Sequence, residues 1–371
     1  MATQTTISLD AMGGDHGPVV VVAGIKDYIR VHGGEGVRFI LHGDETAIAA
    51  EMARCKLGAE TCEIRHTDKV VAMDEKPAQA MRRGKGSSLW NAIEAVKTGE
   101  AGAVVSAGNT GALMAIAKLI LRMSAPGLER PAIVASWPTL KGVTAVLDVG
   151  ANIESDAEQL IEFAIMGEAF HAAVHGAQSA GRAGSGRPSI GILNVGSEDV
   201  KGHEEVREAH QILKNNSLDL NYHGFVEGDD IAKGTVDVVV TDGFTGNIAL
   251  KTAEGTARFI SALLKEALTS NLQAKLGALV AMPALKTMGR RIDPSAINGG
   301  PLLGLNGIVV KSHGGANAKG FGNAIRIGVD LARSDYMTKV GANLGRLDDV
   351  MHAVPAAQTT VSDQVSGETL Q

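Results

Sequence analysis

This sequence has little cysteine, no long hydrophobic run and no excess of positive charge. Only Cys55 and Cys62 occur among 371 residues, without metal-finger spacing, which excludes a disulfide scaffold and fits a reducing, cytoplasmic location. No apolar run reaches the ~20 residues that span a bilayer, and residues 1–6 lack the basic and apolar regions of a signal peptide. The net charge of −6 and the pI of about 6.0 argue against a general nucleic-acid binder.

Motifs of several common catalytic folds are missing too. The Walker pattern G-x-x-x-x-G-K does not occur, and no G-x-G-x-x-G turn is followed by an acidic residue at the end of the next strand. The sequence has no G-x-S-x-G elbow, and neither cysteine lies at a strand-to-helix turn, so a covalent acyl-enzyme has no obvious nucleophile. We therefore predict no cofactor, and a direct displacement is the simpler chemistry.

The chain does contain a regular alternation of strand and helix patterns. Apolar residues make up 44% of it, and the 46 glycines, which follow no collagen period, predict many tight turns. Strands are expected at residues 7–9, 37–41, 62–66, 103–105, 143–149, 190–193 and 236–240. This alternation predicts an α/β fold, with a mainly parallel sheet covered by helices on both faces.

Ligands of such sheets bind beyond the carboxyl ends of the strands. Five polar or glycine-rich loops follow predicted strands, at residues 10–17, 106–111, 148–152, 194–201 and 241–247. We expect these loops to converge on one edge of the sheet.

Capping residues mark several helix ends. Pro18 opens a helix that Gly33 closes, and Asp44 caps the next one. Ser155 and Glu158 have the spacing of a capping box for the helix that follows them.

Residues 106–121 read as a strand end, a glycine turn and a helix. The turn leaves backbone N–H groups without partners at a helix start, where the helix dipole also favours an anion. An ordinary strand-to-helix connection without a ligand has the same pattern, so other parts of the chain must decide between the two interpretations.

Three segments interrupt the alternation. Residues 76–85 are basic and contain glycine, which predicts a loop that is either solvated or in contact with an anionic partner. Residues 176–188 are rich in Gly, Ser and Ala and predict a flexible surface connection. The polar residues after Pro355 predict a frayed tail.

Residues 258–291 form a basic amphipathic segment within an acidic protein. Apolar residues recur there at helical spacing, and six basic side chains against Glu266 give a net charge of +5. Pro283 and Gly289 are expected to break the segment into pieces. A membrane surface with anionic lipid or an acidic protein partner would fit it, and so would a core or dimer helix with a solvated basic face.

Asp10, Asp15 and His16 lie in the first loop and could hold Mg²⁺ or Mn²⁺. Carboxylates in a tight loop more often accept hydrogen bonds from their own backbone, so we predict no metal site.

Four ordered motifs resemble the bacterial phosphate acyltransferase family. They are LDAMGGD at residues 9–15, SAGNTGA at 106–112, DGFTGN at 242–247 and KSHG at 311–314. RPA at 130–132, LDVGAN at 147–152 and LNVG at 193–196 extend the similarity over nearly the whole chain, from Ile7 to about Val354.

The resemblance implies transfer of a fatty acyl group from acyl carrier protein to inorganic phosphate, which gives acyl phosphate for phospholipid synthesis. It implies a Rossmann-like three-layer α/β/α fold, related to phosphate acetyltransferases and isocitrate dehydrogenases, with the basic helical segment as an excursion. It also implies a homodimer that associates peripherally with the membrane, a single catalytic domain over residues 1–354 and a tail over 355–371. Residues 176–188 look longer and richer in glycine than the family pattern, and residues 196–202 keep its lysine in a slightly altered form.

Read with this resemblance, the strand-end residues divide into two sets. The catalytic set has Lys201 on the phosphate, His313 and Asn247 as donors to the oxyanion or the leaving sulfur, and Asp242 as an orienting residue. The predicted phosphate and substrate-binding set is Asp10, Gly13, Gly14, Ser106, Gly108, Asn109, Thr110, Asn194 and Thr245. By pattern alone, His313 could equally be a structural histidine and Asp242 a turn residue.

Two other functions stay open. One is a short-chain phosphate acetyltransferase that uses coenzyme A. The other is a non-catalytic module that binds a carrier protein or a membrane.

Overall fold

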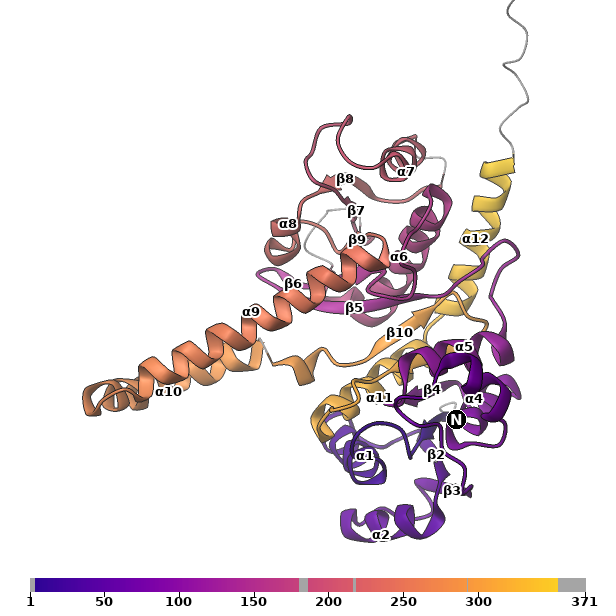
Figure 1. The fold of residues 1–371 in the computed structure, drawn as a ribbon, viewed down its shortest axis with the longest axis vertical. Helices are drawn as coiled ribbons and strands as arrows, with labels where there is room; N and C mark the ends of the chain where they lie inside the picture. Colours follow the sequence, from indigo (N-terminus) through magenta and orange to yellow (C-terminus); the bar gives the residue numbers. More distant parts are fainter. Residues whose placement is uncertain (1–3, 180–185, 216–217, 292, 353–371) are drawn as a thin grey trace, which may run out of the picture.

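The computed structural model describes residues 4–179, 186–215, 218–291 and 293–352 (Figure 1). Its strands are β1 (Thr5–Asp10), β2 (Val37–Gly43), β3 (Cys62–His66), β4 (Ala103–Ser106), β5 (Ala132–Thr139), β6 (Gly142–Leu147), β7 (Ile190–Leu193), β8 (Tyr222–Val226), β9 (Val238–Val240), β10 (Gly300–Leu303) and β11 (Ile308–Lys311). Its helices are α1 (Pro18–His32), α2 (Glu45–Cys55), α3 (Pro77–Arg83), α4 (Ser88–Lys97), α5 (Thr110–Leu121), α6 (Ala157–Ser179), α7 (Glu204–Lys214), α8 (Gly228–Lys233), α9 (Gly243–Thr269), α10 (Leu272–Arg291), the short 3-10 helix η1 (Pro294–Ala296), α11 (Ala318–Arg333) and α12 (Tyr336–His352).

The strands form one sheet with the order β3-β2-β1-β4-β11-β10-β5-β6-β9-β7-β8. The first five strands in this order are parallel to one another, and so are the last four. Between them, β10 is antiparallel to β11 and to β5, and β5 is antiparallel to β6. The sheet is therefore mainly parallel, as predicted, but its two parallel halves run in opposite directions.

Because the two halves of the sheet run in opposite directions, the expectation that all five loops converge on one edge of the sheet is wrong. Lys311, at the end of β11, pairs with Gly300 of β10, while Leu147, at the end of β6, pairs with Val134 of β5. Because β5 itself pairs with β10 at Leu302, the two carboxyl ends lie at nearly the same level of the central strands. The loops of the two halves thus approach this level from opposite sides.

Side-chain alternation along the strands produces three layers. In β4, Ala103 and Val105 belong to one buried cluster with residues of α1 and α11, whereas Val104 packs with α4 and α5. In β9, Val238 and Val240 pack on the side of α6, and Val239 faces the opposite cluster. Successive side chains of a strand point to opposite faces of the sheet, so a strand that is buried between two helical layers needs apolar side chains at every position.

Most predicted helix ends are confirmed. Helix α1 begins at Pro18 and is followed by Gly33, and the Asp44 carboxylate accepts a hydrogen bond from Ala47 N at 2.6 Å. The capping box before α6 is displaced by one residue from the prediction, because Asp156 Oδ1 accepts from Gln159 N while Gln159 Oε1 accepts from Asp156 N.

Two segments differ from the predicted loops. Residues 77–83 form helix α3, which starts at a proline and packs on α5. Helix α6 continues to Ser179, through the start of the predicted flexible connection 176–188, of which residues 180–185 lie outside the described ranges.

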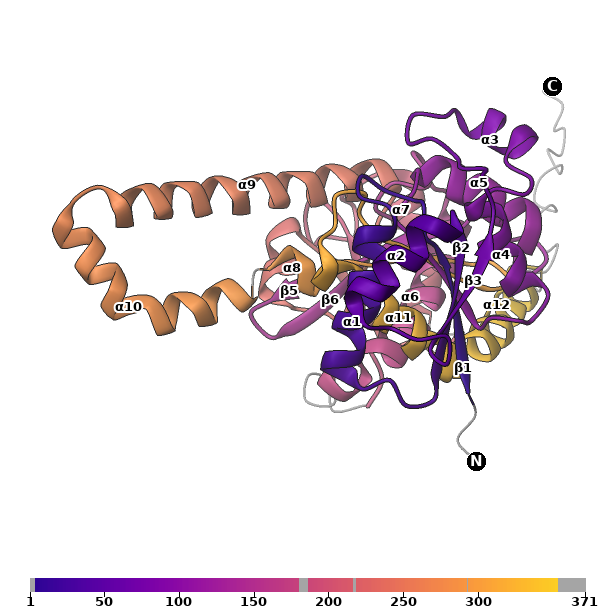
Figure 2. The same cartoon turned by 90° about the horizontal axis from the view of Figure 1, so that it is seen from below.

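Helices α9 and α10 form a hairpin that projects from the body of the molecule (Figures 1 and 2). The chain turns at Ser270 and Asn271, where Asn271 Oδ1 accepts from Ala274 N. The predicted breaks at Pro283 and Gly289 are wrong, since α10 continues through both residues. The hairpin exposes many large apolar side chains, namely Phe259, Ile260, Leu263, Leu272, Leu276, Leu279, Val280, Met282 and Met288.

Among the helices of the described ranges, none is both long and apolar enough to cross a membrane. The assignment of residues 1–354 to a single catalytic domain stays a prediction, and the predicted tail 355–371 lies outside the described residues.

Candidate active site

Asp10 joins several elements in the first parallel half of the sheet (β3, β2, β1, β4 and β11). It ends β1, is 2% exposed, and accepts hydrogen bonds from Ser88 Oγ and Ser106 Oγ, both at 2.7 Å. Burial raises the pKa of the Asp10 carboxyl, although the two serine hydroxyls oppose that rise. The carboxylate thus holds α4 and β4 against the loop that follows β1.

Glycines let three loops meet beside Asp10. A Cβ on Gly13 would stand 2.7 Å from Gly108 N, so only glycine allows the first loop to approach the second this closely. Gly14 lies against Ala107 and Gly314, and Asp15 N donates to Gly314 O at 3.0 Å. The loops after β1, β4 and β11 therefore form one cluster, which we call the glycine-turn cluster (residues 10–15, 106–111 and 311–315).

The turn at the start of α5 is held by its own side chains. Ser106 Oγ accepts from Gly108 N at 3.0 Å, so that amide already has a partner. Asn109 caps the helix through Ala112 N, and its Nδ2 donates to Met73 O and Glu75 O. Thr110 follows in the first helical turn, where backbone N–H groups have no carbonyl partner within the helix.

Lys311 of the KSHG motif lies in the same cluster, although it is not among the predicted site residues. Its Nζ donates to Ala107 O at 3.3 Å and to Ser312 O. Burial lowers the Lys311 pKa to about 8, against the opposing fields of Asp10 and Asp15. Its position directly after an apolar strand is the signal that could have revealed it.

His313 is oriented by two hydrogen bonds. Its backbone N–H donates to Asn298 Oδ1 at 2.9 Å, and its ring Nδ1 accepts from Gly315 N at 3.1 Å. Asn298 Nδ2 in turn donates to the buried Ser312 hydroxyl. Because Nδ1 acts as an acceptor, the neutral ring carries its proton on Nε2 and can donate from there.

Asp148 organises the second half. It is fully buried after β6 and accepts from the backbone N–H groups of Ile133, Gly150, Ala151 and Asn152, as well as from Asn152 Nδ2. Burial raises the pKa of its carboxyl despite these donors.

The first turn of α9 packs on this Asp148 loop. A Cβ on Gly246 would collide with Asp148 O, so the glycine permits direct backbone contact. Asn247 then lies beside Gly150. Asp242 caps α9, since its carboxylate accepts from Thr245 N at 2.8 Å and from Thr245 Oγ1 at 2.7 Å.

Lys201 and Asn194 form a third, more open group. Asn194 Nδ2 donates to Lys201 O at 3.1 Å, which closes the loop after β7. The Lys201 side chain is 51% exposed, and its Nζ lies 4.0 Å from Glu198 Oε1. It therefore stands at the surface, in contrast to the partly buried Lys311.

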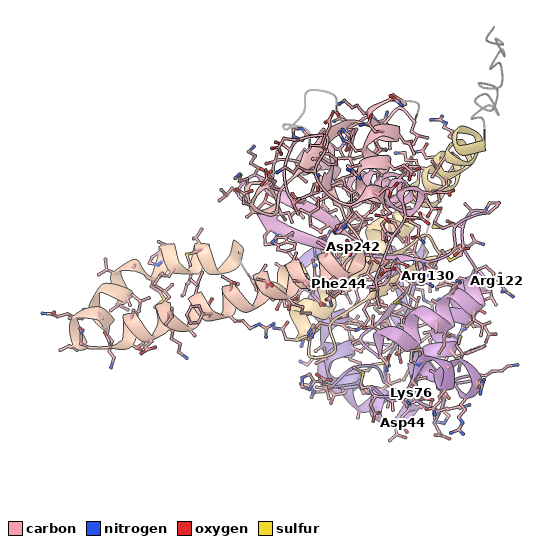
Figure 3. All side chains as sticks on the ribbon, turned by 45° about the horizontal axis from the view of Figure 1, so that its top comes forward. Asp44, Lys76, Arg122, Arg130, Asp242 and Phe244 are labelled. Atoms are coloured by element: carbon pink, nitrogen blue, oxygen red, sulfur yellow. The ribbon has the colours of Figure 1, made fainter. Side chains whose placement is uncertain are left out.

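A cavity of about 700 Å³ links the glycine-turn cluster to the hairpin. His313 and Ala316 line one side, and Ala257, Ser261 and Gly289 of the hairpin line the other. We call it the hairpin-base cavity. Figure 3 labels Asp242 and Phe244 at the start of the same helix α9, where the hairpin leaves the body of the molecule.

The described residues contain no group of three or more His, Cys, Asp or Glu side chains arranged to hold a metal. The absence of a metal and of a cofactor stays a prediction.

Comparisons with known proteins decide which chemistry this arrangement serves. A family model described as "Fatty acid synthesis protein" matches residues 5–339. The phosphate acyltransferase of Caulobacter vibrioides is 64% identical over 371 residues, covering 100% of this chain and 99% of its own length. The chain belongs to the phosphate acyltransferase family. The family member from Phenylobacterium zucineum is 57% identical over 94% of this chain and 95% of its own length.

Solved structures agree at the level of the fold. A phosphotransacetylase from Streptococcus pyogenes superposes with a TM-score of 0.55 at 19% identity, covering 89% of this chain and 94% of its own. A phosphotransacetylase from Staphylococcus aureus gives a TM-score of 0.52 at 16% identity, with the same coverage. The predicted Rossmann-like α/β/α class of the phosphate acetyltransferases is thereby confirmed.

Proposed function

We propose that this phosphate acyltransferase family member transfers a fatty acyl group from acyl carrier protein to inorganic phosphate, and that it acts in the cytoplasm. The observation that carries the proposal is the glycine-turn cluster, where the partly buried Lys311, the start of α5 and the oriented His313 adjoin one another. An anion is stabilised there by a cation and by the helix dipole together.

The reaction needs positioning more than a strong base. Phosphate at neutral pH is already anionic, so its oxygen can attack the thioester carbonyl directly. The C–O bond to phosphate forms, the C–S bond breaks, and the carrier thiol leaves with the electron pair and then takes up a proton. The protein must hold the phosphate against the carbonyl and stabilise the oxygen charge that develops.

We assign the roles as follows. Lys311 and the backbone N–H of Thr110 hold phosphate, with Lys201 closing from the rim. His313 Nε2–H and the Asn247 amide donate to the oxyanion or to the leaving sulfur. Asp242 orients the start of α9, while Asp10 with Ser106, and Asn194 with its loop, fix the geometry of the turns.

A thiol-release assay tests this function. The protein is incubated with phosphate and either palmitoyl carrier protein or acetyl coenzyme A, and free thiol and acyl phosphate are measured. We expect release from the carrier substrate and a loss of about 100-fold or more for His313→Ala. Release from acetyl coenzyme A alone would make it a short-chain phosphate acetyltransferase, and release from neither would favour a binding module.

The carrier protein docks, in this proposal, on the surface of α3. Lys76, Arg82, Arg83 and Lys85 give residues 76–85 four positive charges and no negative one, and exposed Met81 lies among them. The segment touches the candidate site, because Gly111 packs on Pro77 and Asn109 holds the backbone of Met73. An acidic carrier protein complements such a surface.

Charge reversal tests this surface. Arg82→Glu with Arg83→Glu should raise the KM for the carrier substrate at least tenfold and leave kcat nearly unchanged, most visibly at low salt. Reversal of Arg30 and Arg54, exposed on other helices, is the matched control. An equal effect of both pairs would remove α3 as the docking surface.

The hairpin provides the proposed contacts with a second copy and with an anionic membrane surface. Its exposed apolar side chains would stay in water in a monomer, and Val280 is 84% exposed. Leu276→Glu with Leu279→Glu should reduce co-flotation with anionic vesicles or dissociate the dimer in sedimentation. Leu140→Glu, on the exposed turn between β5 and β6, is the control; unchanged flotation and sedimentation would exclude both contacts for these leucines.

A further inference from the structure

The hairpin-base cavity begins at the proposed reaction centre and ends at the hairpin. His313 stands at its inner end, fixed by Asn298 and by Gly315 N, with its Nε2 proton available as a donor. Ala257 and Ser261 are one turn apart on α9 and present small side chains to the cavity, and Gly289 of α10 presents none. The cavity is therefore continuous from the catalytic loop to the helices.

The cavity has open space beside Gly289. A Cβ built on it meets no atom within 4 Å, so the glycine does not serve a close backbone contact there. Charged side chains such as Glu254 and Arg258, which form an ion pair at 3.1 Å, also line the cavity. Asp293, Ser295 and Asn317 add further polar groups to the lining, but most of the surface that the lining exposes to the cavity is carbon. Such a lining fits a flexible apolar chain with a polar head better than a fully polar ligand.

The glycine-turn cluster restricts where an acyl tail can go. On the inner side of His313, Ser312 is fully buried, and Ala107 and Val310 are buried in the core. A thioester whose carbonyl contacts His313 Nε2 therefore cannot direct its tail into the body of the protein, whereas the cavity is open. The carrier surface proposed on α3 adjoins the same cluster through Met73, which reaches Gly314.

We propose that the hairpin-base cavity holds the acyl tail of the substrate and of the acyl phosphate product, and that Ala257 and Gly289 help to set the acyl-chain length. This inference rests on the proposed function for its choice of ligand. The carrier docks on one side of His313, and the tail extends into the cavity on the other.

Filling the cavity provides the test. Gly289→Leu and Ala257→Leu each add a branched side chain within helices, which leucine favours. Gly277→Leu is the matched control, because Gly277 also has no atom within 4 Å of a built Cβ, lies in the same helix α10 and does not line the cavity. Circular dichroism and thermal melting verify that each variant folds.

The first readout is kcat/KM with phosphate for carrier thioesters of increasing chain length. Each methylene excluded from apolar contact should cost about fourfold. We expect Gly289→Leu and Ala257→Leu to lose at least tenfold with the longest chain and less than twofold with the shortest one that wild type accepts. An equal loss at every length would place the pantetheine arm in the cavity and overturn the proposal, and so would no loss.

The second readout needs no catalysis. Hexadecyl phosphonate, a stable stand-in for the product, should bind wild type and the Gly277→Leu control equally, and bind Gly289→Leu at least tenfold more weakly. Methyl phosphonate should bind all three alike. If wild type released no thiol yet showed this pattern, the reaction assigned above would fail while the tail site stood; equal binding of hexadecyl phosphonate to all variants would refute the tail site itself.

Discussion

Each parallel half of the sheet has a buried aspartate at the carboxyl end of a strand, but the two aspartates accept hydrogen bonds from different donors. Asp10 follows β1 and Asp148 follows β6, both are buried, and both begin a glycine-containing loop. Asp10 accepts hydrogen bonds from two serine hydroxyls, which come from α4 and from the end of β4, and the backbone N–H groups of Met12 and Gly13 also stabilise its carboxylate. Asp148 accepts mainly from backbone N–H groups of its own loop and of Ile133.

This difference separates what each carboxylate stabilises. Hydroxyl groups can rotate about their C–O bonds, so two of the donors to Asp10 can change direction. Backbone N–H groups are fixed, so the loss of Asp148 leaves several donors that cannot reorient. The first half thus has a more adjustable cluster with a partly buried cation, and the second half has a rigid base for α9.

The largest expected effect is on stability, in the second half. Asp148→Ala removes the acceptor of several buried donors and should lower the free energy of unfolding by about 3–5 kcal/mol. Urea denaturation followed by circular dichroism measures it. The control Asp44→Ala removes one exposed helix cap and should cost about 1 kcal/mol. Equal losses would mean that the Asp148 loop rearranges to satisfy its donors.

The next effect separates the two lysines. Lys311→Met should lower kcat/KM for phosphate about 100-fold, and Lys201→Met less, because the charge of a partly buried, desolvated lysine is less screened than that of a half-exposed one. A lysine is cationic below its pKa, so with a pKa of about 8 the wild-type kcat/KM should decline as the pH rises through 8. Lys311→Arg, which stays charged, should lack that decline. A larger effect of Lys201→Met would assign the phosphate to the second half.

The smallest effect concerns Asp10. Asp10→Ala should lower the free energy of unfolding by about 1–2 kcal/mol, less than Asp148→Ala, because the Ser88 and Ser106 hydroxyls can rotate whereas backbone N–H groups cannot, and Asp10→Asn should cost less. The same denaturation experiment measures both. A loss for Asp10→Ala as large as that for Asp148→Ala would erase the distinction between hydroxyl and backbone donors.

Local patterns in the sequence predict the elements of this fold well. Proline at the start of α1 and Asp44 before α2 act within one turn of the chain, so their effects can be read directly. Helix α3 was missed because basic residues 82, 83 and 85 look like a solvated loop, while its packing on α5 is a tertiary contact. Local pattern also cannot reveal the antiparallel strands β10 and β5 that reverse the second half.

The candidate site was predictable in its loops but not in its contacts. Motifs with Asp10, Ser106 and His313 were visible, and the structure brings these residues into one cluster. The surroundings of each side chain decide the rest, since sequence alone does not distinguish the partly buried, desolvated Lys311 from the half-exposed Lys201.

Helix α9 fixes a distance as well as a contact. It starts beside the Asp148 loop and continues unbroken for 27 residues, which makes a rod of about 40 Å. Ala257 and Ser261, which line the hairpin-base cavity together with His313, lie in the second half of this rod. The length of α9 beyond the Asp148 loop therefore brings the hairpin alongside the loop of His313, and an acyl tail held in the cavity would extend toward the tip of the hairpin.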